Sequence, residues 1–377
     1  MKGNIKMVDL SGQYEKIKDE INKAIQDVIE TTSFIKGPDV KIFRDNLQKY
    51  LGGSYVTPCA NGTDALQVAM MALDLQPGDE VITTPFTFIS TVEVIKLLKL
   101  RPVLVDIDDE SFNINADKIE DAITSKTKAI VPVHLFGQCA DMNKILDISQ
   151  RKGLFVIEDT AQAMGAEFYH NDGSTTKAGT LGHIGTTSFF PSKNLGAYGD
   201  GGAIFTSDKV LSEKISAIVN HGMSRRYYHD YVGVNSRLDT IQAAILTIKL
   251  KYLDDYNRER QISAAYYDDK LMGHEHISIP HRVKFSNHIF HQYTLKINND
   301  SRDDLKLFLQ DQGIPSMIYY PIGLHLQQAY GDLGYKKGDF PVTEDICRKV
   351  LSIPMHTELK KKQQKFITKK ILEFFNQ

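Results

Sequence analysis

The chain has 377 residues, of which 42% are hydrophobic and 24% are charged, and its formal net charge at pH 7 is -2. This balance is typical of a globular protein and carries no charge excess that would draw it to nucleic acid or to an anionic membrane. The three cysteines, Cys59, Cys139 and Cys347, are widely spaced and form no CxxC pair. They therefore predict neither a disulfide framework nor a metal site.

The first residues contain no continuous apolar run of the kind that directs secretion, and no later segment approaches the length needed to span a membrane. We therefore expect a cytoplasmic protein. The length exceeds the size at which a single hydrophobic core stops growing, so we also expect one large domain and one smaller domain.

Short apolar runs alternate with helical patterns from an amphipathic helix at Tyr14 to Glu30 up to about residue 250. The helices predicted between strands include Ala65 to Leu73, Thr91 to Leu98 and Met142 to Gln150. Strands that are apolar on both faces and separated by helices predict an α/β domain with a mainly parallel sheet, whose strand order stays open. The predicted strands are Glu80 to Thr84, Pro102 to Asp106, Ala129 to His134, Phe155 to Ile157, Thr186 to Phe190 and Ala203 to Thr206.

A long helix at Ser236 to Leu253 is predicted to continue through the charged segment 254–260 and to bridge two lobes. We place the domain boundary there, with a large α/β domain at 1–253 and a small C-terminal α+β domain at 254–377. The polar run Asn171 to Lys177 predicts an exposed turn. The small domain is predicted to hold a strand at Ile289 to Ile297 and helices at Asp303 to Gln312 and Lys361 to Phe375.

Two residues carry most of the chemical argument. Asp159 follows an apolar strand, and Lys193 ends the run Ser188 to Lys193. A lysine that can form an imine, preceded by an aspartate at the end of a strand, is the minimum equipment for holding pyridoxal 5'-phosphate (PLP). Asp159 would keep the ring nitrogen protonated, while Lys193 would exchange amines and move the α-proton as general acid and base. Taken alone, such an aspartate is usually a cap and such a lysine is usually solvated.

The segment Asn61 to Asp64 precedes a helix and would offer backbone N–H groups of Gly62 and Thr63 to a phosphate. Taken alone, such a segment is more often a plain helix cap. The carboxylate of Asp64 would repel a phosphate, so we credit the backbone. Ser188 is a further phosphate candidate.

Phe88 is our choice for an aromatic that lies on the pyridine ring, and Phe86 is assigned to the core. Gln162 would support the ring's substituent oxygen, or would be solvated.

These residues resemble motifs of the nucleotide-sugar aminotransferases of the PLP-dependent fold-type-I superfamily, often called the DegT/StrS type, along nearly the whole chain. The resemblance implies that Lys193 is the Schiff-base residue, that Asp159 meets the pyridine nitrogen and that Phe88 stacks on the ring. It places Thr63, Asp64 and Ser188 around the phosphate. The matching blocks are Ala60 to Leu66, Gly78 to Ile82, Ile157 to Gln162, Ser188 to Lys193 and Gly233 to Asp239.

The resemblance also implies a homodimer whose active site is shared between subunits. Asn235 would reach the phosphate from the other subunit, and Arg237 would lie near the donor or the sugar. Tyr320 and His325 correspond to a segment that approaches the sugar in relatives, and packing beneath a loop is the alternative for both. The turn at 171–177 looks longer than in the family, and His183 replaces a different polar residue.

The implied reaction is a two-stage transamination. L-glutamate converts PLP into pyridoxamine 5'-phosphate, which then aminates a keto group of a nucleotide-linked sugar. The block from Phe189 to Gly202 is most similar to members that act on 3-keto sugars, which favours a UDP-linked 2-acetamido-3-keto sugar or sugar acid. A dTDP-linked 3-keto-6-deoxyhexose and amination at C4 are the alternatives. The product would feed a cell-surface glycan such as O-antigen or lipopolysaccharide.

Two other functions are considered. The related PLP-dependent sugar dehydratases resemble this family with histidine in place of the motif lysine, so the presence of Lys193 argues against that activity. A catalytically silent PLP-binding regulator is the alternative from a different functional class.

Overall fold

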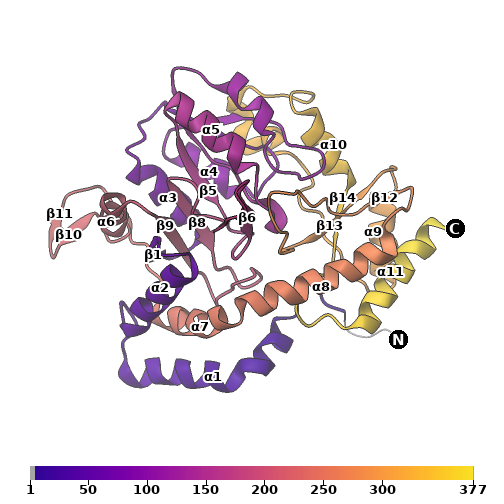
Figure 1. The fold of residues 1–377 in the computed structure, drawn as a ribbon, viewed down its shortest axis with the longest axis horizontal. Helices are drawn as coiled ribbons and strands as arrows, with labels where there is room; N and C mark the ends of the chain where they lie inside the picture. The colour runs from indigo at the N-terminus through magenta and orange to yellow at the C-terminus, as the bar shows by residue number, and fades with distance from the viewer. Residues whose placement is uncertain (1–4, 377) are drawn as a thin grey trace.

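The computed structural model describes residues 5–376 and is built around one seven-stranded sheet (Figure 1). The strand order is β1-β9-β8-β5-β4-β2-β3, and β9 alone runs antiparallel to its two neighbours, β1 and β8. The α/β class and the mainly parallel sheet agree with the sequence-based prediction. The strands are β1 (Tyr55–Cys59), β2 (Glu80–Thr83), β3 (Arg101–Leu104), β4 (Thr127–Ile130), β5 (Phe155–Asp159), β8 (Ile184–Ser188) and β9 (Gly202–Thr206).

Both faces of the sheet are buried because successive apolar residues of each strand point to opposite sides. On one face, Ile157 and Ile204 pack in the cluster that contains α3 (Gly62–Ala72), α4 (Ser90–Leu97) and α6 (Lys209–Ile218). On the other face, Val156 packs in the cluster of α5 (Met142–Lys152), and Phe205 packs with α2 (Pro38–Tyr50) and α7 (Thr240–Lys251). Full burial of each such side chain contributes about 1.5–3 kcal/mol. Helix α1 (Leu10–Thr31) covers α7 through Ile17 and Ile21.

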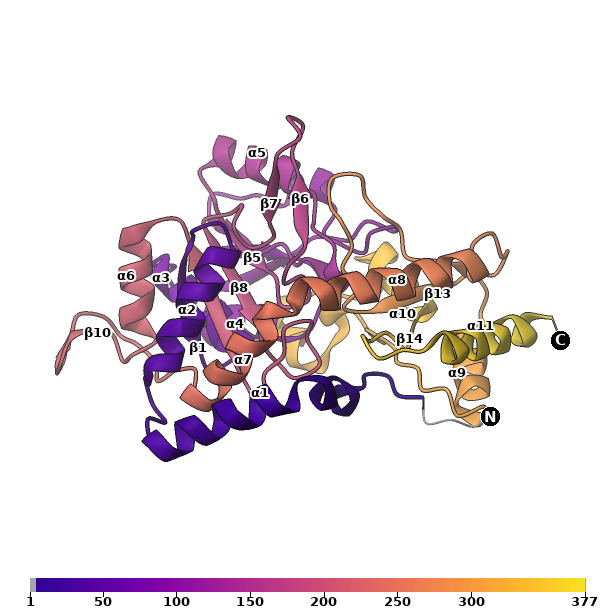
Figure 2. The same cartoon turned by 60° about the horizontal axis from the view of Figure 1, so that its bottom comes forward.

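The long helix predicted from Ser236 is two helices. The chain first forms α7, breaks at Tyr252, and continues as α8 (Leu253–Leu271). Helix α8 runs from the large sheet toward a second, antiparallel sheet (Figure 2). That sheet contains β12 (Ile277–Ser278), β13 (Tyr293–Ile297) and β14 (Val350–Ile353), packed with α9 (Arg302–Asp311) and α11 (Lys361–Phe375), while α10 (Pro341–Lys349) precedes β14. The exact domain boundary stays a prediction.

Several local predictions differ from the structure. The predicted strands at 129–134 and 186–190 end early, at Ile130 and Ser188, and the chain then turns into the loops that line the site. The predicted turn at 171–177 belongs to a hairpin of β6 (Glu167–Tyr169) and β7 (Thr175–Lys177). Short 3-10 helices lie at Ala116–Lys118, Glu120–Ala122, Leu135–Gly137, Leu324–Leu326 and Gln328–Leu333.

A small hairpin of β10 (Met223–Arg225) and β11 (Tyr228–His229) projects from the body in both views (Figures 1 and 2). Its neighbourhood exposes Tyr227, Tyr231 and Val232, and Val232 is 87% exposed. The three cysteines are buried and unpaired. Among residues 5–376, no helix has both the length and the apolar content needed to cross a membrane.

Candidate active site

A cavity of about 900 Å³ opens at the carboxyl ends of the parallel strands. Ligands of open α/β sheets bind at this edge. The sheet contributes the ends of β5 and β8 and the segments that follow β1 and β2. The two residues directly before β13 (Tyr293–Ile297) and the loop at 319–327 also line the cavity. The lining includes these residues predicted from the sequence: Gly62, Thr63, Asp64, Phe88, Asp159, Gln162, Ser188, Lys193 and Tyr320.

Lys193 lies in the loop between β8 and β9, and its backbone N–H donates to the carbonyl of Phe190 at 2.8 Å. Gly196 keeps this loop tight, because a Cβ there would lie 2.3 Å from the carbonyl oxygen of Pro191. Desolvation lowers the pKa of the Lys193 amine to about 8, and the charge of Asp159 opposes part of that shift. With this pKa, roughly a tenth of Lys193 is neutral and nucleophilic at pH 7, far more than for an ordinary lysine.

Asp159 ends β5 and is buried. Its Oδ1 accepts a hydrogen bond from the N–H of Ala161, and its Oδ2 accepts one from the Thr91 hydroxyl, both at 3.1 Å. Burial raises the pKa of the Asp159 carboxyl, while the hydrogen bonds from Ala161 and Thr91 and the charge of Lys193 act in the opposite direction. A cationic ring placed against this carboxylate would be held by opposite charge at short range.

The N-terminus of α3 faces the same cavity. Asn61 Oδ1 accepts from the N–H of Asp64 at 2.8 Å, so the side chain of Asn61 caps the helix. The N–H groups of Gly62 and Thr63 stand before the intrahelical hydrogen bonds begin and are available to an anion. A Cβ on Gly62 would lie 2.7 Å from Cβ of Ser188, so only glycine lets this helix end approach β8 so closely. The Ser188 hydroxyl accepts from the N–H of Phe190 at 3.2 Å and keeps its own proton for a ligand.

The two phenylalanines after β2 have different environments. Phe86 is fully buried and packs edge-to-face with Phe112, Phe136 and Tyr320, whereas Phe88 is 56% exposed and lines the cavity. An exposed aromatic at a cavity wall offers its face to a ligand ring.

Gln162 links two parts of the lining. Its Oε1 accepts from the N–H of Phe136 at 2.8 Å, and its Nε2 donates to the hydroxyl of Tyr320 at 3.1 Å. Gln162 is therefore neither solvated nor free to rotate, and it holds Tyr320 at the cavity wall.

Three predicted residues are not brought to this cavity within the chain. His325 is 2% exposed, its Nε2 lies 3.1 Å from Glu344, and its ring packs against Phe340. His325 is therefore a buried packing residue in this structure, which is the alternative that the sequence left open. The backbone of Asn235 forms an isolated antiparallel β-bridge with Asn220, near the projecting hairpin. Neither Asn235 nor Arg237 lines the cavity.

The structure adds a residue that sequence reasoning missed. His291 lines the cavity, is 7% exposed, and burial beside Lys193 and Arg260 holds the pKa of its imidazole well below the usual range. Its segment is fixed because the buried Arg260 donates to the carbonyls of Phe290, His291 and Met355. In the sequence His291 stands inside a strand-like run, which carries no signal of a site.

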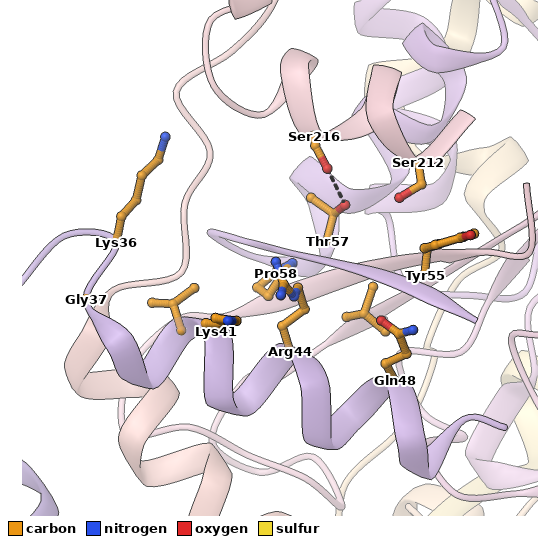
Figure 3. Close-up of a pocket in the computed structure, with 12 residues that line it drawn as sticks. Lys36, Gly37, Lys41, Arg44, Gln48, Tyr55, Thr57, Pro58, Ser212 and Ser216 are labelled. Atoms are coloured by element: carbon orange, nitrogen blue, oxygen red, sulfur yellow. Dashed lines mark hydrogen bonds between the residues drawn. The ribbon is translucent and has the colours of Figure 1, made fainter. Parts of the chain in front are cut away.

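A second cleft of about 480 Å³ lies between α2, β1 and α6 (Figure 3). Lys36, Lys41 and Arg44 approach it from the α2 side, and a hydrogen bond of 3.0 Å joins the hydroxyls of Thr57 and Ser216 beside it. This cleft contains none of the site residues predicted from the sequence.

Known proteins are similar to this chain along nearly its whole length. Residues 15–372 match the model of the DegT/DnrJ/EryC1/StrS aminotransferase family. The chain is 46% identical over 375 residues to a pleiotropic regulatory protein of Geobacillus stearothermophilus, with 99% of each chain covered. It is 44% identical over 357 residues to the UDP-2-acetamido-2-deoxy-3-oxo-D-glucuronate aminotransferase of Pseudomonas aeruginosa, with 94% of this chain and 96% of the relative covered.

Solved structures give the same result. A DegT DnrJ EryC1 StrS aminotransferase from Brucella abortus superposes with a TM-score of 0.94 at 40% identity, covering 99% of this chain and all of the other. NtdA from Bacillus subtilis, solved with bound cofactor PMP, superposes with a TM-score of 0.88 at 32% identity, covering 96% of this chain and 82% of the other. The chain therefore belongs to the DegT/DnrJ/EryC1/StrS aminotransferase family, and it is a PLP-dependent aminotransferase.

Proposed function

We propose that this enzyme transfers the amino group of L-glutamate to the 3-keto group of a UDP-linked 2-acetamido sugar or sugar acid. The observation that carries the amino-transfer chemistry is the placement of Lys193 and Asp159 in one cavity with the N-terminus of α3. The choice of a UDP-linked 3-keto sugar is supported by the relative from Pseudomonas aeruginosa. A dTDP-linked 3-keto-6-deoxyhexose and a 4-keto sugar are the alternatives.

The residues present fit PLP at each end. The free N–H groups of Gly62 and Thr63 and the Ser188 hydroxyl suit its phosphate, and Asp159 suits its ring nitrogen. Phe88 lies where it can cover the ring face, and Gln162 is held where it can meet the ring oxygen. When bound, PLP supplies an aldehyde that exchanges amino groups and a ring that withdraws electrons.

In this proposal Lys193 is the general acid and base. Because its pKa is lowered to about 8, the amine would take the proton from the α-carbon of glutamate and deliver it to the former aldehyde carbon of bound PLP.

We further propose that the working form is a homodimer. Among the described residues that line the cavity, Asp64, Asp159 and Asp200 are acidic and Lys193 is the one lysine or arginine. Glutamate and the nucleoside diphosphate of a UDP-linked sugar are both anionic, so the cavity of a single chain offers them too few cationic side chains. Arg237 and Asn235 of a second subunit would supply the missing polar groups, and the exposed apolar residues of the projecting hairpin support a partner surface there.

The wider setting is part of the same proposal. We place the enzyme in the cytoplasm, where it would supply an amino sugar to a cell-surface glycan such as O-antigen or lipopolysaccharide. Its keto substrate must come from an oxidation of a nucleotide-linked sugar hydroxyl. A strain without the enzyme is expected to lack the amino sugar in hydrolysed surface glycan, while a strain with unchanged amino sugar content would contradict this placement.

The central experiment has two stages. Protein loaded with PLP is incubated with L-glutamate, and the bound cofactor is expected to convert to its pyridoxamine form by absorbance. A panel of UDP- and dTDP-linked 3-keto and 4-keto sugars is then added, and the aminated product is identified by mass. An unchanged absorbance would instead support the catalytically silent regulator. The relative from Geobacillus stearothermophilus is described as a pleiotropic regulatory protein, which is why this alternative is tested.

Borohydride trapping identifies the reacting lysine. Burial lowers the pKa of both Lys193 and Lys249 to about 8, but only Lys193 lines the cavity. The reduced cofactor is therefore expected on the peptide that contains Lys193 and not on the one that contains Lys249. Label on Lys249, or an unchanged label in Lys193→Ala, would overturn the assignment.

A further inference from the structure

Asp159 is held by two donors that come from different elements. The N–H of Ala161 follows β5 directly, whereas the hydroxyl of Thr91 comes from the first turn of α4. Each donor binds a different carboxylate oxygen at 3.1 Å. Since rotation about the last torsion of an aspartate is otherwise soft, these two contacts select one orientation of the carboxylate.

The backbone of Asp159 is equally fixed. Its N–H donates to the carbonyl of Pro132 at 2.9 Å, and its carbonyl accepts from the N–H of His134 at 3.0 Å. With the backbone held by the neighbouring chain segment, Thr91 and Ala161 decide where the side chain points. Asp159 itself lines the cavity.

Thr91 itself is fully buried and does not line the cavity, although its neighbour Ser90 does. A role through direct ligand contact is therefore excluded for Thr91 in this geometry. The hydroxyl acts on Asp159, and donors to a carboxylate favour its charged form against the desolvation that burial imposes. That charged form is the one that can hold a protonated ring nitrogen.

We propose that Thr91 is a positioning residue of this active site, whose hydroxyl sets the orientation and charge of Asp159 and, through it, the protonation of the pyridine nitrogen of bound PLP. This inference rests on the proposed function. It adds to the residues that would contact the cofactor a buried residue that would act on the cofactor only through Asp159.

The test compares Thr91→Val, which keeps the shape and removes the hydroxyl, with Thr91→Ser, which restores it. The first readout is the equilibrium affinity of the apo protein for PLP. We expect Thr91→Val to weaken binding about 10- to 100-fold, because a hydrogen bond to a charged group is lost, and Thr91→Ser to recover most of it. The second readout is the 15N chemical shift of labelled ring nitrogen, which is expected to move toward the unprotonated value only in Thr91→Val.

Kinetics add a third readout. We expect kcat of the glutamate half-reaction to fall in Thr91→Val while KM changes little, because Thr91 does not touch the substrate. Thr83→Val is the matched control, since the Thr83 hydroxyl is also buried but donates to the carbonyl of Val131 at 2.9 Å on the sheet. Thr83→Val is expected to alter thermal stability without moving the 15N shift.

Each failure has a separate meaning. Wild-type affinity and an unchanged 15N shift in Thr91→Val would overturn the role of Thr91 and leave the proposed function intact. Equal 15N shifts in Thr83→Val and Thr91→Val would reduce the effect to general core damage and also overturn it. Wild-type protein that takes up no PLP would defeat the proposed function itself.

Discussion

The Glu158 carboxylate and the His134 imidazole form a fully buried pair, with Nε2 of His134 donating to Oε2 of Glu158 at 2.8 Å. His134 Nδ1 accepts from the N–H of Ala140, so the ring proton sits on Nε2. The same carboxylate accepts from the N–H groups of Gly179, Leu181 and Gly182 at 2.6–2.9 Å. Glu158 thus fixes the loop before β8 and the end of β5, one residue before Asp159.

We predict that Glu158→Gln lowers the free energy of unfolding by about 3 kcal/mol, because the amide NH₂ would face backbone donors and leave buried groups unpaired. Urea unfolding of the apo protein measures this. Glu167→Gln is the control, since Glu167 pairs with Lys177 at the partly exposed hairpin and its loss should cost less than about 1 kcal/mol. Equal losses in the two variants would contradict the assigned role of Glu158.

Gly62→Ala should damage cofactor binding more than folding. The new Cβ would press on Ser188 and push the N-terminus of α3 away from β8. Overpacking of this kind costs about 1–3 kcal/mol. If the helix end shifts to relieve it, that energy is lost from phosphate binding, so we expect PLP affinity to fall about 5- to 150-fold. Gly331→Ala serves as the control, because no atom lies within 4 Å of its added Cβ. Wild-type affinity in Gly62→Ala would show that the phosphate does not bind at this helix end.

Capture of PLP by the apo protein should depend on pH through Lys193. Only the neutral amine attacks the aldehyde, and with a pKa of about 8 the neutral fraction rises as pH increases and levels off above that value. Stopped-flow rates are therefore expected to increase about tenfold per pH unit below the midpoint.

Asp159→Asn provides the matched test of that midpoint. The charge of Asp159 raises the Lys193 pKa, so its removal should move the midpoint to lower pH. A midpoint near that of a free lysine, or one that Asp159→Asn moves upward, would contradict the electrostatics described for this cavity.

Mixing two inactive variants tests the shared active site. Lys193→Ala removes the reacting amine, and Arg237→Ala removes the group proposed to act in the partner's cavity. Random exchange makes half of the dimers mixed, and each mixed dimer has one intact site, so about a quarter of wild-type activity should return. Activity that stays at the level of the separate variants would show that Arg237 acts within its own subunit or outside the site.

The sequence predicted the large-domain elements well where their apolar period was strong, as in α3, α5 and β5. It missed α2 and β1, because α2 buries only Phe43 and Leu47 and β1 contains Pro58. It also joined α7 and α8, since the break at Tyr252 rests on one backbone conformation that no residue type announces.

The site divides in the same way. Local motifs identified Lys193, Asp159 and the segment before α3. Each has a signal in the residues next to it: a motif around a reactive amine, the end of an apolar strand, and a helix cap. The buried environment of His325 and the cavity position of His291 were not, because each depends on partners more than ten residues away along the chain.

The amino-acid sequence by itself determined the chemistry available to this protein: one reactive lysine, one strand-ending carboxylate and a helix start open to phosphate. Only the tertiary structure decided that these groups share one cavity, that Thr91 and Ala161 orient Asp159, and that desolvation brings the pKa of Lys193 to about 8. The physical reason is that hydrogen bonding and desolvation act through space, whereas a sequence pattern records only neighbours along the chain.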